Sequence, residues 1–143
     1  YYLVEREKLR EYATAVQNAD AVYFDEDAAA ALGHTSLVPP LTFISVFGYV
    51  AIRAFFDSAD IGITDKQIVH VDQALKFLKR VNTGDKLFSD VYVDDVRQAH
   101  GTDIIVIKNV ISNQDGEAVQ ETYTTLAGRS DDSGESGFND GAA

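Results

Sequence analysis

The chain has 143 residues, and its 23 acidic and 12 basic side chains give it a net charge of −11. This length suits one domain with its own core, and the negative charge disfavours nucleic acid or an anionic membrane surface as partners. The chain contains no cysteine, which excludes disulfides, a thiolate nucleophile and cysteine metal sites.

The first part of the chain has helical periodicity. Between Glu5 and Val16, apolar residues recur at intervals of three and four, which predicts an amphipathic helix. A shorter helix is predicted from Asp25 into a run of alanines, because its acidic side chains lie where the helix dipole favours them. Gly33 suits the position just after the end of that helix.

The longest apolar stretch runs from Leu41 to Phe56, and Arg53 interrupts it. It is shorter than the ~20 residues that a membrane span requires. We therefore expect no membrane span and interpret the stretch as a helix that is buried almost all round. The sequence shows no basic, apolar signal segment, so the predicted location is the cytoplasm.

From Lys66 onward the periodicity changes to that of β-strands. Alternating runs begin near Leu87, Ile104 and Val119, with turn-type breaks at residues 82–85, 100–102 and 113–116. These hairpin-type breaks predict antiparallel neighbours. Helices followed by long strands indicate an α+β fold in which the sheet wraps the long helix, although composition does not separate this from other α+β folds.

The end of the chain differs in composition from the rest. Residues 130–143 are rich in Asp, Glu, Gly and Ser, and such a segment cannot bury enough apolar surface to order itself. We expect a flexible acidic tail there, after a single domain that spans residues 1–129.

The N-terminal half resembles the MaoC-like (hydratase 2) family, whose members carry a segment of the form Ser-Gly-Asp-x-Asn-Pro-x-His-x-Asp after the first helix. Residues 16–25 occupy the matching place here. The alanine-rich helix, the loop with Pro39 and Pro40, and the apolar helix follow in family order. The resemblance implies a hot-dog fold, with an antiparallel sheet wrapped around a long helix, and (R)-specific hydratase or dehydratase chemistry.

Several stretches are more narrowly similar to the A-type, non-catalytic subunits of mycobacterial (3R)-hydroxyacyl carrier-protein dehydratases. They are residues 4–8, 15–18, 40–44, 46–49 and 120–129. This implies a heterodimer with a smaller catalytic MaoC-like subunit. The pair would dehydrate (3R)-hydroxyacyl thioesters on an acyl carrier protein, in type II fatty-acid elongation toward mycolic acids. The A-type chain is implied to shape the acyl tunnel, and no cofactor is expected.

Dehydration of such a thioester needs a base for the C2 proton, an acid for the departing hydroxyl and a donor for the carbonyl. The family supplies the acid/base pair with an Asp and a His five residues later. The matching residues here are Asn18 and Tyr23. An amide exchanges no proton near neutral pH, and a phenol with a pKa of about 10 is a poor base. We therefore expect no catalytic residue in this chain. Asn18 and Tyr23 could form local hydrogen bonds or narrow the tunnel, or they could be ordinary packing and capping residues.

Other acid/base or metal sites have less support. Asp20 or Asp25 could pair with His34, but His34 is more simply read as an exposed loop residue. His70 and His100 are similarly isolated, and no two histidines have metal-ligand spacing, so we expect no metal.

Five residues of the apolar helix are the candidate tunnel residues: Phe43, Ser45, Phe47, Gly48 and Tyr49. The simplest reading is that they belong to the core, and the family resemblance adds that one helix face also lines an acyl tunnel. Ser45 either faces that tunnel or bonds back to a helical carbonyl. Gly48 costs about 1 kcal/mol relative to Ala in a helix, and we expect a strand to pack closely against it.

One basic cluster stands out in this acidic chain: Lys76, Lys79, Arg80 and Lys86. It either contacts the phosphates of phosphopantetheine or of the carrier protein, or it protects a solvated strand edge.

Three functions remain open at this point. The first is the silent, tunnel-forming subunit of a heteromeric dehydratase. The alternative is a stand-alone acyl-thioester-binding homodimer, since the same sheet edge could pair with a copy of itself. A weaker possibility is a thioesterase that uses an Asp such as Asp20 to direct water.

Overall fold

The structure is a computed structural model that describes residues 1–59, 68–100 and 102–128. In chain order, the helical elements are α1 (Arg6–Ala15), the 3-10 turn η1 (Ala21–Tyr23), α2 (Glu26–Ala31), the 3-10 turn η2 (Leu41–Phe43) and α3 (Ile44–Ser58). The three predicted helices are therefore present. The expected tail at residues 130–143 lies outside the described residues.

The ends of the short helices follow from local chemistry. The Asp25 side chain accepts hydrogen bonds from the backbone N–H groups of Asp27 and Ala28, and so caps α2. Gly33 follows the end of α2 with a φ of +80°, a left-handed conformation that favours glycine. Asp20 caps η1 in a similar way through the N–H of Val22.

Five strands form one antiparallel sheet in the order β1-β3-β4-β5-β2. They are β1 (Tyr2–Leu3), β2 (Ile68–Phe77), β3 (Lys86–Ala99), β4 (Thr102–Ser112) and β5 (Ala118–Gly128). The breaks at 100–102 and 113–116 join neighbouring strands, as predicted. The break at 82–85 does not, because β2 pairs with β5 at one edge while β3 pairs with β4. That prediction was wrong since a turn signal does not reveal which strand comes next in space.

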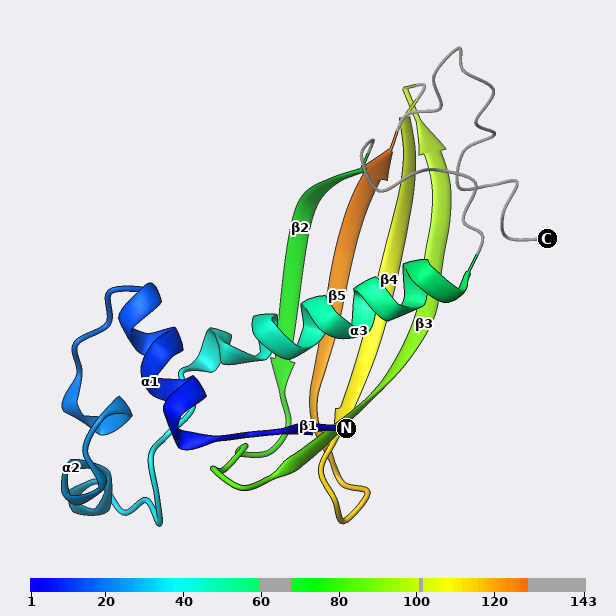
Figure 1. The fold of residues 1–143 in the computed structure, drawn as a ribbon. Helices are drawn as coiled ribbons and strands as arrows, with labels where there is room; N and C mark the ends of the chain where they lie inside the picture. The colour runs from blue at the N-terminus through cyan, green and yellow to red at the C-terminus, as the bar shows by residue number, and fades with distance from the viewer. Residues whose placement is uncertain (60–67, 101, 129–143) are drawn as a thin grey trace.

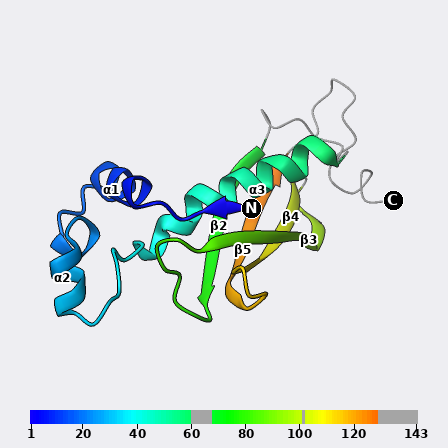
Figure 2. The ribbon, with the colours of Figure 1, turned by 60° about the horizontal axis from the view of Figure 1, so that its bottom comes forward.

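The long helix α3 lies across the concave face of this curved sheet, and α1 and α2 lie beyond its N-terminal end (Figures 1 and 2). One buried cluster joins α1 and the start of α3 to the sheet through Leu9, Phe43, Phe47, Leu87 and Ile111. A second lies farther along α3 over Ile105, Ile107 and Leu126. The expected arrangement of a sheet around a long helix is thus confirmed.

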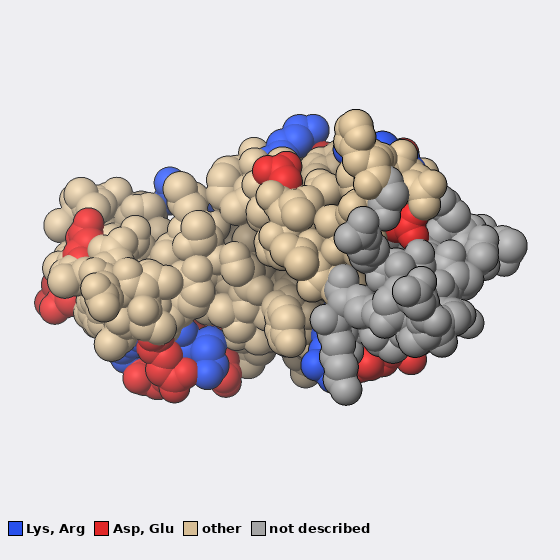
Figure 3. All heavy atoms as spheres, turned by 90° about the horizontal axis from the view of Figure 1, so that it is seen from above, with Lys and Arg blue, Asp and Glu red and all other residues tan. Residues whose placement is uncertain are grey.

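The α3 helix is less buried than its composition predicts. Of its residues only Ile44, Phe47 and Gly48 are buried, whereas Tyr49 and Val50 are 65% and 55% exposed. The expectation of burial all round was wrong because one sheet covers only one face of a helix. In the view of Figure 3, charged side chains gather at the margins of a broad uncharged surface.

By length and composition, the stretch Leu41–Ser58 is also apolar enough to cross a membrane. One such helix is weak evidence, since core helices of soluble proteins pass the same test. Phe43 and Phe47 of this stretch pack into the core with Leu9 and Leu87, although only 17% of the stretch is buried.

Candidate functional site

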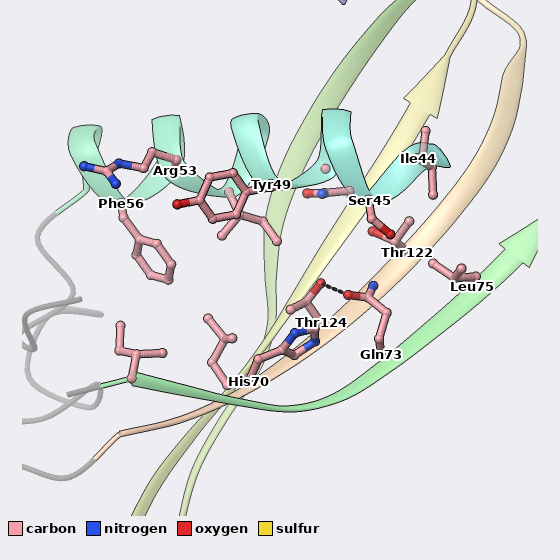
Figure 4. Close-up of a pocket in the computed structure, with 15 residues that line it drawn as sticks. Ile44, Ser45, Tyr49, Arg53, Phe56, His70, Gln73, Leu75, Thr122 and Thr124 are labelled. Carbon is pink, nitrogen blue, oxygen red and sulfur yellow. Dashed lines mark hydrogen bonds between the residues drawn. The ribbon is translucent and has the colours of Figure 1, made fainter. Parts of the chain in front are cut away.

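A groove of about 640 Å³ lies between α3 and the sheet. Figure 4 shows its roof and floor, with Ser45, Tyr49, Arg53 and Phe56 from the helix and Gln73, Leu75, Thr122 and Thr124 from the strands. Six apolar side chains line it together with polar ones such as His70: Ile44, Ile52, Phe56, Ile68, Leu75 and Leu126. The groove therefore suits an elongated apolar ligand.

The floor carries a patch of polar side chains in this apolar setting. Thr122 and Asn109 are paired across β5 and β4, and Thr124 is paired with Gln73 across β5 and β2. Thr124 donates a hydrogen bond from its Oγ1 to Oε1 of Gln73 at 3.2 Å, drawn in Figure 4. Asn109 is 1% exposed, and neither its Oδ1 nor its Nδ2 has a hydrogen-bond partner in the described chain.

Three of the candidate tunnel residues, Ser45, Gly48 and Tyr49, line this groove. Phe43 and Phe47 do not line it and are buried in the core, although Phe43 borders a second hollow beside Pro39 and Pro40. Ser45 lines the groove, and no hydrogen bond from its side chain to a helical carbonyl is found within the described residues.

The close strand contact expected at Gly48 is absent. The nearest atom to a Cβ built at Gly48 would be Nδ2 of Asn109, at an ordinary contact distance of 3.9 Å. The strand backbone therefore does not require glycine there. Gly48 instead leaves open the space above the Asn109 amide.

Asn18 and Tyr23, which the sequence motif matches to the family's acid/base pair, lie between the end of α1 and the end of η1. Asn18 Oδ1 accepts a hydrogen bond from the backbone N–H of Asp20 at 3.1 Å, a local turn contact. Tyr23 is half-buried and ends η1. Neither residue lines the groove under α3.

The displaced acid/base pair does not assemble in the described chain. Asp20 and Asp25 are engaged as caps, and His34 Nδ1 lies 2.9 Å from the Arg80 guanidinium. Asp20, the residue considered for directing water in a thioesterase, does not line the groove under α3. Among the described residues, no group of three or more His, Asp or Glu side chains could hold a metal ion.

Each side chain of the basic cluster contacts a different neighbouring residue. Lys76 contacts Glu121 at 3.3 Å, Lys79 contacts Glu117 at 2.5 Å, and Lys86 lies over the ring of Tyr1. Arg80 contacts His34, as noted above. These partners are local, and Lys76 is the one member of the cluster that lies on the edge strand β2.

No role was predicted from the sequence for Asn109, Thr122, Thr124 and Gln73. A signal for the first was present in the periodicity of β4. Its buried positions are Asp103, Ile105, Ile107, Asn109 and Ile111, so a single amide interrupts the isoleucine row that follows Asp103. A polar residue on the buried face of a strand is itself informative.

Comparison with known proteins agrees with this geometry. The family described as the FAS1-like dehydratase domain region matches residues 1–122. A UPF0336 protein of Mycobacterium leprae is 64% identical over 143 residues, which are 100% of this chain and 90% of the relative. The C-terminally truncated HadBC (3R-hydroxyacyl-ACP dehydratase) complex from Mycobacterium tuberculosis contains a chain 42% identical to this one. It has a TM-score of 0.82, with 89% of each chain covered.

A solved MaoC-like dehydratase is 34% identical, with a TM-score of 0.82 over 92% of this chain and 40% of that protein. The chain belongs to the MaoC-like hot-dog dehydratase family. The resemblance stated from the sequence motifs is therefore confirmed, as is the α+β hot-dog fold. Within this fold the groove lies under α3, while Asn18 and Tyr23, the residues expected from the motif to replace an acid/base pair, lie outside its lining.

Proposed function

We propose that this chain is the catalytically silent, substrate-binding subunit of a heteromeric (3R)-hydroxyacyl thioester dehydratase. The observation that carries the proposal is the contrast between a well-formed apolar groove and an amide and a phenol at the acid/base positions. The groove would hold the acyl chain. A catalytic MaoC-like partner would supply the Asp and His that remove the C2 proton and protonate the leaving hydroxyl.

The edge of the sheet supports a subunit role. β2 pairs with β5 on one side only, and the described chain offers no strand for its other side. Its exposed apolar residues include Val69, Val71 and Phe77. An unpaired apolar edge of this length is a template for pairing with another chain. The similarity to a chain of the HadBC complex is consistent with a hot-dog partner at this edge.

The finer assignments belong to the same proposal. The substrate would be a long acyl chain carried on an acyl carrier protein, in type II fatty-acid elongation toward mycolic acids in the cytoplasm. No cofactor or metal is needed for this elimination, since an acid/base pair suffices. Residues 1–129 would form the hot-dog domain, with residues 130–143 as an acidic tail.

The deciding experiment is a dehydratase assay on a (3R)-hydroxyacyl thioester. Purified chain alone should be inactive, and co-expression with a catalytic MaoC-like subunit should give activity that disappears when that subunit's Asp and His are replaced. As controls, Asn18→Ala and Tyr23→Phe in this chain should leave the activity of the complex unchanged. Turnover by the chain alone would contradict the proposal.

The alternative is an acyl-thioester-binding homodimer, which the same unpaired β2 edge could form. Light scattering of the purified chain distinguishes the two. A stable homodimer that does not exchange with a catalytic MaoC-like subunit would favour the alternative over the heteromeric dehydratase.

A further inference from the structure

The amide of Asn109 is the polar group that the fold explains least. It is 1% exposed on the concave face of β4, and both Oδ1 and Nδ2 lack a hydrogen-bond partner in the described chain. Leaving a buried donor and acceptor unsatisfied is costly, and such groups in folded proteins nearly always have partners. An isoleucine like its neighbours Ile107 and Ile111 would avoid that cost.

The surroundings of this amide point toward a ligand. Asn109 lines the groove, and the helix position above it is Gly48, which has no side chain to fill the space over Nδ2. The adjacent polar pair differs in this respect, because Thr124 and Gln73 already bond each other. In Asn109, by contrast, the donor Nδ2 and the acceptor Oδ1 are both available to bond a ligand.

The chemistry of an amide limits what such a ligand can be. Nδ2 donates and Oδ1 accepts, so one ligand group that satisfies both must accept and donate. A hydroxyl does so, whereas a hydrocarbon offers neither and a thioester carbonyl only accepts. The groove also presents the apolar side chains Ile44, Leu75 and Leu126, which suit a hydrocarbon chain attached to that hydroxyl.

We propose that Asn109 is a specificity-determining residue that hydrogen-bonds the hydroxyl group of a hydroxylated acyl chain lying in the groove. This rests on the proposed function, in which the groove holds an acyl chain. The amide would then favour chains that carry an oxygen over plain chains of the same length. It takes no part in proton transfer and is a binding residue.

The test measures binding to the complex whose catalytic partner has its Asp and His replaced, so that no ligand is consumed. Three probes of equal length are titrated: hexadecanoyl-CoA, (3R)-3-hydroxyhexadecanoyl-CoA and a hexadecanoyl-CoA with a mid-chain hydroxyl. The wild-type complex should bind one hydroxylated probe roughly tenfold tighter than the plain probe. If the 3-hydroxy probe binds more tightly, the recognised hydroxyl lies near the thioester. If the mid-chain probe binds more tightly, the recognised hydroxyl lies farther along the acyl chain.

Two variants and a control test the role of the amide itself. Asn109→Leu should abolish the preference for the hydroxyl without weakening the binding of plain hexadecanoyl-CoA. Gly48→Ala, which leaves the amide intact, should reduce the preference by filling the space above it. Thr124→Val removes a hydroxyl that is already bonded to Gln73 and should keep the preference. Thermal melts of each variant verify folding.

Equal binding of plain and hydroxylated probes by wild type would overturn the inference, and so would a preference that survives Asn109→Leu. Either result leaves the acyl groove itself standing. A wild-type complex that binds none of the three probes would instead contradict the proposed function, and the inference with it.

Discussion

The segment between α1 and α2 shows how single residues separate local structure from the chemistry expected of this motif. Asp20 and Asp25 cap η1 and α2, and Asn18 closes a turn onto the N–H of Asp20. These contacts need only side-chain oxygens as acceptors. The local fold therefore persists with an amide at position 18, while the ability to transfer a proton is lost.

Glu121 is one of two carboxylates, with Glu117, whose lowered pKa predicts that stability depends on pH. The hydrogen bond from Lys76 is the main reason that the pKa of Glu121 lies below its ordinary value, and the charge of Lys108 acts in the same direction. A carboxylate whose pKa is lowered by folding stabilises the fold above about pH 4. That contribution is lost as the pH falls through its folded pKa.

We expect Glu121→Gln to reduce the loss of stability between about pH 7 and pH 3. Urea unfolding of the variant and of wild type at both pH values measures this. Asp94→Asn, at an exposed carboxylate for which no ion pair is found in the described chain, is the control and should leave the pH dependence unchanged. If the stability of Glu121→Gln fell with pH as much as that of wild type, the ion pairs of Glu121 with Lys76 and Lys108 would not contribute to the pH dependence of stability.

At the scale of elements, α3 serves two surfaces. Phe47 faces the core, with its ring centroid 5.5 Å from that of Tyr2, and Tyr49 faces the groove and is largely exposed. Phe47→Ala should lower the free energy of unfolding by about 3 to 5 kcal/mol. Tyr49→Ala should cost less than about 1 kcal/mol and should weaken acyl binding.

Denaturant unfolding and titration with hexadecanoyl-CoA, performed on both variants, check this division of α3. If Tyr49→Ala destabilised the chain as strongly as Phe47→Ala, the assignment of one face to the core and another to the groove would be wrong.

The edge strand β2 gives a prediction about assembly. Val71 is exposed at the bulge between His70 and Asp72, so Val71→Lys should leave the fold of the chain intact but weaken its pairing with a second hot-dog chain, because lysine blocks edge pairing. Val93→Lys introduces the same charge on β3, away from that edge, and is the control. Analytical ultracentrifugation of the complexes compares them. Equal effects of the two variants would exclude the β2 edge as the interface.

For the whole molecule, the net charge of −11 is the dominant electrostatic property. Repulsion among like charges destabilises a compact state, and salt screens it with a Debye length of about 10 Å at 0.1 M. The thermal midpoint of the chain should therefore rise by a few degrees between about 20 and 300 mM NaCl, as followed by circular dichroism. A lower midpoint at high salt would mean that surface ion pairs such as Lys79–Glu117 outweigh the repulsion.

The sequence by itself determined the local elements of this protein and its family. Helical and strand periods, the caps at Asp20 and Asp25 and the motif around Asn18 and Tyr23 are all encoded within a few neighbouring residues. Tertiary structure decided the rest. The placement of β2 beside β5, the exposed side of α3 and the position of Asn109 beneath Gly48 depend on segments far apart in the chain. No local period encodes such contacts, because they form only when the sheet curves around the helix.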